Sequence, residues 1–157
     1  TISVDRLTEV LSQYGDEPFH HKVAVALLES AKEGKLQTTH NLRDVVLKAV
    51  KRIPGYPLDK EKAPTRILQA VRIEVNEELE SIEDVLKQIP QVMRPGGRVA
   101  FLSFHSGEDR LVKKFFQKGL KSGLFTEIHG PLLATAEEVG LNRRAKSAKL
   151  RFGIVPR

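Results

Sequence analysis

A short apolar segment over residues 98–104 limits the possible folds more than any other part of this 157-residue sequence. A turn of Arg-Pro-Gly-Gly over residues 94–97 precedes it, and a helical pattern over about residues 108–121 follows it. The segment has the length of one strand and lacks polar alternation, which is typical of a parallel strand covered on both faces. Two further strands are expected, at residues 124–129, ended by Gly130-Pro131, and at residues 147–155. This order of elements predicts an α/β unit.

The first third of the sequence has the pattern of three short helices. Apolar residues recur at helical spacing over residues 4–11, with Ser3 as a possible N-cap and Gly15 placed to stop the helix. A second helix is expected over residues 16–33 and a third from about residue 39 to a Pro/Gly-rich loop at 53–57. Together they predict a small helical unit.

The longest helical pattern follows a charged linker at residues 59–62. Apolar residues recur in steps of three and four from Leu68 to Ile89, and Pro64 suits a first-turn position. Because Pro90 bends or interrupts a helix, two helices that meet near residues 79–81 are an alternative to one.

Composition excludes several classes of site. The sequence contains no cysteine, so it forms neither disulfides nor thiolate metal sites. Its five histidines have no ligand spacing, and we expect no metal site. No apolar run approaches the roughly 20 residues that cross a bilayer, and the first residues have no signal-peptide pattern. We expect no membrane partner.

Charge is uneven along the sequence, whose net charge is +6. Residues 1–109 hold 15 Lys/Arg and 17 Asp/Glu, whereas residues 110–157 hold 11 and 3. Such a basic block is either an electrostatic footprint for phosphates or a solvated face, and charge alone favours neither.

Residues 103–110 place polar side chains where the apolar strand ends and a helix begins, at the edge where open α/β sheets bind ligands. Ser106 and Asp109 resemble a capping box, and Glu108 suits the positive end of the helix dipole. Capping explains these three residues but leaves His105 unexplained. The functional interpretation places Ser103, His105 and Ser106 around a bound base or cofactor edge as donors and acceptors.

Two other segments are candidates for RNA contact. On the helix that begins at Pro64, one face carries Arg66, Gln69, Arg72 and Asn76, which can hold phosphate or contact base edges. The alternative is a solvated face with Arg72 paired to nearby glutamates. The second segment contains Arg143, Arg144 and Lys146, which either clamp a nucleic-acid backbone or form a solvated loop.

Taken together, these segments resemble one family, the small-subunit ribosomal RNA (cytosine-N4) methyltransferases of the H type. Residues 65–79 are similar to its T-R-x-x-Q-A-x-R-I-x-V-N-x-E-L helix, and residues 95–110 to its P-G-G-R…S-F-H-S-L-E-D-R segment. Residues 14–17 and 142–151 resemble its Y-G-E-E and N-P-R-A-R-S-A-x-L-R motifs. Gly107 and Arg143 depart from the family, which has leucine and proline there.

The resemblance implies an α/β fold: the C-terminal half of a Rossmann-like class I methyltransferase domain (parallel strand, helix, antiparallel strand pair) plus a small helical insertion domain. Residues 1–63 would be the helical RNA-recognition domain, and residues 64–157 the C-terminal part of the methyltransferase domain. The last two strands would lie beside the 99–104 strand, whose other edge would be uncovered. We therefore expect marginal stability, homo-oligomerisation, or pairing with a missing N-terminal half.

The implied function is S-adenosylmethionine-dependent N4-methylation of a cytidine in small-subunit ribosomal RNA. Ser103, His105 and Ser106 would form the catalytic site by shaping the pocket for the target base. The RNA-binding residues would be Arg66, Gln69, Arg72, Asn76, Arg143, Arg144 and Lys146. The residues that bind the cofactor S-adenosyl-L-methionine would lie mostly outside this chain, because the family's Gly-rich, His-bearing loop and its D-L-G-x-S-S segment have no match here.

Two other functions remain open from the sequence. One is a non-catalytic RNA- or ribosome-binding remnant of the same family, and the other is a helical protein-interaction domain. The expected location is the cytoplasm of a bacterium, or otherwise a mitochondrion or chloroplast.

Overall fold

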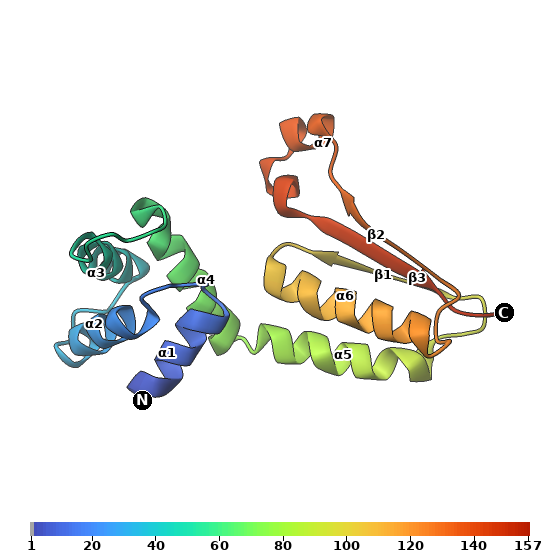
Figure 1. Ribbon diagram of the computed structural model, residues 1–157, viewed down its shortest axis with the longest axis horizontal. Helices are drawn as coiled ribbons and strands as arrows, with labels where there is room; N and C mark the ends of the chain where they lie inside the picture. The colour runs from blue at the N-terminus through green and yellow to red at the C-terminus, as the bar shows by residue number, and fades with distance from the viewer. Residues whose placement is uncertain (1) are drawn as a thin grey trace. The chain divides into compact units, whose positions relative to one another are not determined.

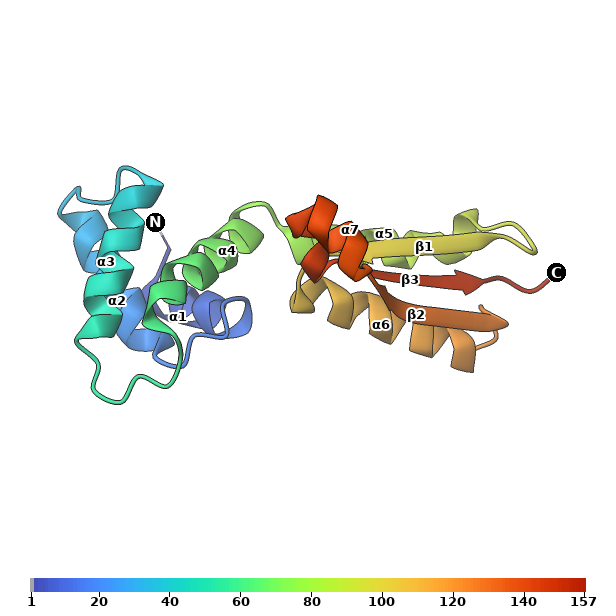
Figure 2. The same cartoon turned by 90° about the horizontal axis from the view of Figure 1, so that it is seen from above.

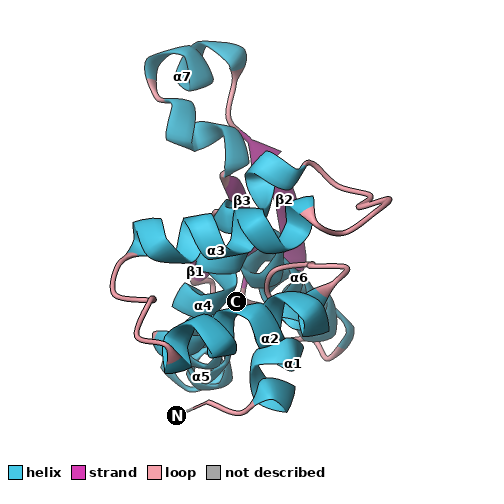
Figure 3. Ribbon diagram, turned by 90° about the vertical axis from the view of Figure 1, so that its left-hand side faces the viewer, coloured by secondary structure: helices cyan, strands magenta, loops and turns pink. Residues whose placement is uncertain are grey.

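The computed structural model describes residues 2–157, which form two compact units (Figure 1). The first unit extends to Glu78 and is helical, whereas all described strands belong to the second unit, Leu79–Arg157 (Figure 3). No helix among residues 2–157 is long and apolar enough to cross a membrane.

The helical unit contains four α-helices and one short 3₁₀ helix. These are α1 (Val4–Gln13), α2 (His20–Lys32), α3 (Thr39–Lys51), η1 (Lys60–Lys62) and α4 (Ala63–Val75). Ser3 caps α1 as predicted, since its side chain accepts the Arg6 N–H. The second helix begins four residues later than expected, because Asp16 has a left-handed φ of 46° that a helix cannot continue through.

The core of this unit explains why it extends past the expected boundary at residue 63. Val10 and Leu11 of α1 pack with Val46 of α3 and with Ile67 and Ala70 of α4, and all five are almost fully buried. Because α4 thus completes the helical core, the compact unit continues to Glu78. The roles expected for the two domains stay predictions.

The long helical pattern forms two helices, with a break between Val75 and Glu78. The second helix, α5, is Glu78–Val92. The break lies before the expected position at residues 79–81, because Glu77 has a φ of 49°. Pro90 lies inside the last turn of α5 and does not end it.

The second unit continues with six elements. These are β1 (Arg98–Ser103), α6 (Ser106–Lys121), β2 (Glu127–Leu133), α7 (Ala136–Leu141), η2 (Arg143–Ser147) and β3 (Lys149–Ile154). The three strands form one sheet in the order β1-β3-β2, with both pairs antiparallel (Figure 2). The structure confirms that β2 and β3 pair and that β3 lies beside β1.

Two strands differ in detail from their predictions. Within residues 2–157 the only neighbour of β1 is antiparallel, so its place in a parallel sheet stays a prediction, and β1 is covered on one face instead of two. The reason is that α5 and α6 lie on the same side of the sheet, so Ala100 and Leu102 stay exposed on the other side (Figures 1 and 2). The strand β2 also continues past Gly130-Pro131. Proline is tolerated there because β2 is an edge strand with an irregular register between His129 and Leu132.

Aromatic rings form the core between α6 and the sheet. The ring of Phe116 packs edge-on against that of Phe101, with the ring centroids 6.2 Å apart. Its centroid lies 5.2 Å from that of Phe125. Two glycines allow this packing. A Cβ on Gly119 would lie 2.5 Å from Phe125, and one on Gly153 would lie 2.9 Å from both Phe116 and Phe125. This cluster fixes α6 on the sheet and so fixes the junction that precedes it.

Candidate functional site

The predicted site lies where β1 ends at Ser103 and α6 begins at Ser106. Glu108 Oε2 accepts the backbone N–H groups of Phe104 and His105, at 2.7 and 3.3 Å. In return, the Glu108 N–H donates to His105 Nδ1 at 3.4 Å. The N-cap is therefore His105 and its partner is Glu108, one residue earlier than the predicted capping box of Ser106 and Asp109.

His105 thus has a structural role that the sequence pattern did not indicate. Because Nδ1 accepts a hydrogen bond, the proton of the neutral ring is on Nε2. This buried Nε2 makes no hydrogen bond in the structure, although it lies 3.4 Å from Glu108 Oε1. A Cβ on Gly107 would lie 3.1 Å from His105 Nδ1, so the missing side chain at position 107 leaves room for the ring.

The three predicted catalytic residues differ in exposure. Ser103 is 3% exposed, the His105 side chain is 11% exposed, and Ser106 is exposed. Although a four-residue segment brings them together, only Ser106 is freely open to solvent. Their catalytic role stays a prediction.

An ion cluster fixes the start of α6 to β3. Asp109, which is 8% exposed, accepts two hydrogen bonds from the Arg151 guanidinium, at 2.7 and 3.2 Å. Lys149 Nζ lies 3.5 Å from the same carboxylate. The hydrogen bond from Arg151 is the largest of the effects that hold the pKa of Asp109 below its usual range. The sequence pattern missed this pair, because 42 residues separate its members.

Arg66, a predicted RNA contact, belongs to a buried cluster in the helical unit. Its Nη2 donates to Tyr56 Oη at 2.7 Å and to Glu17 Oε2 at 3.2 Å. Tyr56 also donates to Glu17, at 2.5 Å, and burial together with this bond raises the pKa of Tyr56. The guanidinium of Arg66 therefore neutralises a fully buried carboxylate. Because the Arg66 side chain is only 22% exposed, it offers little surface to a phosphate.

The other predicted contacts on α4 are also engaged or partly covered. Arg72 makes two hydrogen bonds to the Glu78 carboxylate, at 2.8 and 3.1 Å, and Asn76 donates to the same group at 3.1 Å. The pair agrees with the alternative interpretation of this face, in which Arg72 bonds to a nearby glutamate, and Gln69 is half-buried. The RNA-binding role of this face stays a prediction.

Arg143, Arg144 and Lys146 lie in η2 and are exposed. Within residues 2–157, none of the three makes an ion pair. Buried Ala145 fixes the segment, and Asn142 Oδ1 accepts the Arg144 N–H at 3.1 Å. The cations of η2 are thus held at the surface without an ion pair among the described residues.

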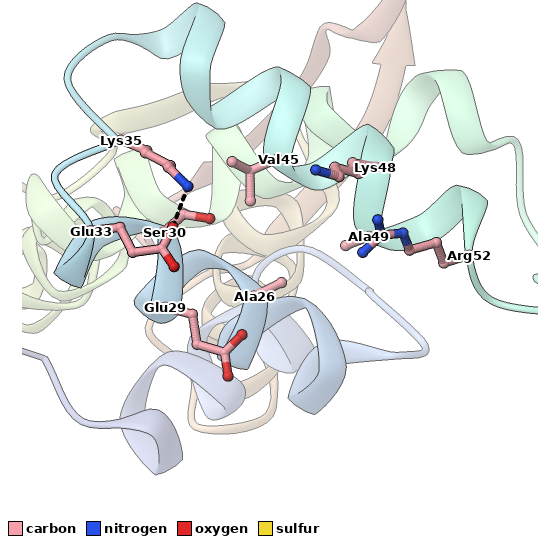
Figure 4. Close-up of a pocket in the computed structure, with 9 residues that line it drawn as sticks. All are labelled: Ala26, Glu29, Ser30, Glu33, Lys35, Val45, Lys48, Ala49 and Arg52. Atoms are coloured by element: carbon pink, nitrogen blue, oxygen red, sulfur yellow. Dashed lines mark ion pairs between the residues drawn. The ribbon is translucent and has the colours of Figure 1, made fainter.

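A separate cleft of about 370 Å³ lies between α2 and α3 in the helical unit (Figure 4). Carboxylates of α2 and cations of α3 line it, and Lys35 pairs with Glu33 at 2.5 Å. None of the catalytic or RNA-binding residues predicted from the sequence lines this cleft.

The second unit is a mixed α/β structure with an antiparallel sheet, and a cluster of hydrogen-bonding groups lies at the junction between β1 and α6. A family model described as the MraW methylase family matches residues 1–153. The chain belongs to this family, which confirms the resemblance found in its motifs.

Curated relatives agree with the family. Ribosomal RNA small subunit methyltransferase H 2 of Alkaliphilus metalliredigens is 42% identical over 98% of this chain and 45% of its own length. The protein of the same name in Acholeplasma laidlawii is 40% identical over 94% of this chain and 44% of its own length. Ribosomal RNA small subunit methyltransferase H of Thermosipho melanesiensis is 39% identical over 95% of this chain and 49% of its own length. The chain therefore spans about half the length of the curated relatives that it matches.

Proposed function

We propose that this chain takes part in S-adenosylmethionine-dependent methylation of small-subunit ribosomal RNA, at the exocyclic N4 amine of a cytidine. The observation that carries the proposal is the position of the S-F-H-S-x-E-D-R segment. It lies at the carboxyl end of β1 and the start of α6, where α/β enzymes hold ligands. The family and the names of the relatives support the same reaction class.

The residues of this chain do not by themselves fit the cofactor. The adjacent glycines Gly96 and Gly97 precede β1, at the end of the strand away from the junction. Their backbone groups bond to Pro156 and Val155, which leaves no open Gly-rich loop there. The cofactor, when bound, supplies an activated methyl group.

The proposed task of the junction is to hold the target base. His105 Nε2 makes no hydrogen bond, although it lies 3.4 Å from Glu108 Oε1, and the next residue, exposed Ser106, offers a hydroxyl. These groups would hold the edge of an extracted cytosine in one orientation.

Replacement of His105 in the full-length protein tests the proposal. His105→Ala also removes the N-cap of α6, which costs about 1 kcal/mol. His105→Asn keeps a good N-cap and removes the imidazole, so it separates the two roles. We expect His105→Asn to lower the methylation turnover much more than the RNA affinity, at unchanged Tm. Turnover equal to that of the parent protein would contradict the pocket role.

The alternative is a non-catalytic RNA-binding module, and the exposed cations of η2 favour it. A methyl-transfer assay with the full-length protein distinguishes the two. RNA binding without methyl transfer would support the module, whereas methyl transfer would exclude it.

A further inference from the structure

The solvent side of α6 carries a set of cations that the site described above does not use. It is defined here as the α6 basic face, and its members are Arg110, Lys113, Lys114, Lys118 and Lys121. All five side chains belong to exposed residues, and none makes an ion pair within residues 2–157. Some exposed lysines outside α6 do pair with a carboxylate, namely Lys35, Lys51 and Lys87.

Helix geometry places these cations together. At 100° per residue, the five positions fall within an arc of roughly 140°, and from Arg110 to Lys121 they extend over about 16 Å. The opposite side of the helix buries Val112 and Phe116 against the sheet. The core thus fixes which side of α6 faces solvent and holds the cations in one row.

Few carboxylates lie near these cations along the sequence. Residues 110–126 contain no Asp or Glu. The preceding carboxylate, Asp109, is buried and neutralised by Arg151 and Lys149. The next one, Glu127, lies 3.3 Å from a ring nitrogen of His129. Because like charges on adjacent helical turns destabilise a helix, an uncompensated row indicates a partner that supplies the negative charge.

A cleft of about 240 Å³ adjoins one side of the row, between α6 and β2. Its lining combines apolar and polar side chains, namely Phe116, Ile128, Pro131, Lys113, Gln117, His129 and Arg151. A polyanion with flat apolar groups between its charges fits this combination, because the phosphates can lie along the row while a base or ribose enters the cleft. Single-stranded nucleic acid has this chemistry.

We propose that the α6 basic face binds the phosphate backbone of single-stranded RNA, with the adjoining cleft as a subsite for one nucleoside. The proposal rests on the RNA substrate of the proposed function and adds a surface that extends along α6 from the strand–helix junction. Each phosphate contact releases counterions, so the affinity must depend steeply on salt.

The test compares two doubly substituted forms of this chain that lose the same charge. The first, Lys113→Gln with Lys114→Gln, neutralises the row beside the cleft. The control, Lys87→Gln with Arg94→Gln, neutralises exposed cations of the same unit outside α6. Glutamine has nearly the helix propensity of lysine, so both variants should fold, and circular dichroism checks this. The probe is a fluorescein-labelled single-stranded RNA of mixed sequence, titrated by anisotropy at several salt concentrations.

For the α6 variant, we expect the slope of log affinity against log salt to fall by about 0.7 per lost contact, and the affinity near 0.1 M salt to fall about fivefold per contact. The control should stay within twofold of the parent chain. Equal losses in both variants, or an unchanged slope in the α6 variant, would overturn the inference and leave methyl transfer untouched. Failure of the parent chain to bind the RNA would overturn the inference as well, whereas the methyl-transfer assay judges the proposed function separately.

Discussion

The ion pair between Asp109 and Arg151 should be the strongest polar contribution to the stability of the sheet unit. Both side chains are 12% exposed, and the guanidinium donates two hydrogen bonds to the carboxylate. Asp109→Asn keeps the shape but leaves Arg151 charged and without its counter-charge. Breaking a buried pair in this way costs about 3–5 kcal/mol, and the remaining exposure together with the neighbouring backbone reduces the loss to about 2–4 kcal/mol.

A matched control is Asp84→Asn. Asp84 pairs with Lys87 at 2.9 Å in the same unit, but the two side chains are 67% and 70% exposed. Such a surface pair contributes less than about 1 kcal/mol. Urea unfolding followed by circular dichroism gives the free energies, and amide exchange of peptides from β1 and β3 assigns the loss to the sheet unit. Equal losses for the two variants would refute the argument.

The difference between the parent chain and Asp109→Asn should also depend on pH. Folding lowers the pKa of Asp109, so the carboxylate is favoured in the folded state. Its contribution to stability is fully present above the pKa of an unfolded aspartate, about 3.9, and is lost as the pH falls through the lower folded pKa. We therefore expect a constant difference from neutral pH down to about pH 5 and a shrinking one in acid. A difference that persists at pH 2 would contradict the role of the charge.

Two further substitutions test packing and the buried cluster of the helical unit. Gly119→Ala should lower the free energy of unfolding by about 1–3 kcal/mol, because its Cβ would lie 2.5 Å from Phe125, whereas Gly140→Ala in α7, with no neighbour within 4 Å, should be neutral or stabilising. Urea unfolding compares the two. Tyr56→Phe should cost about 1–3 kcal/mol, because it removes a hydrogen bond to buried Glu17. An unchanged Tm would exclude that bond as a stabilising contact.

Helix positions could be predicted from sequence where local signals act alone. Ser3, Pro64 and the apolar spacing placed α1 and α4, because caps and periodicity depend only on neighbours along the chain. The start of α2 and the break after α4 could not be predicted so well. Both depend on non-glycine residues with positive φ, Asp16 and Glu77, which sequence patterns rarely indicate.

Long-range contacts account for most other differences. The sequence pattern placed the polar segment at the end of β1. It could not show that Arg151 neutralises Asp109 or that Arg66 forms an ion pair with buried Glu17. The apolar pattern of β1 also predicted a strand covered on both faces, whereas Leu102 is 55% exposed on the side of the sheet without helices. Apolar character indicates where a strand can be buried, and only the surrounding elements decide whether it is.

The strand order β1-β3-β2 makes the sheet depend on its middle strand. Neither β1 nor β2 can form its hydrogen-bond ladder until β3, which follows both along the chain, has been added between them. While β3 is still missing, both strands present open edges, a state that favours pairing with other chains. During synthesis, the aromatic side of α6 therefore lacks part of the surface that it packs against until residues 149–154 have been made.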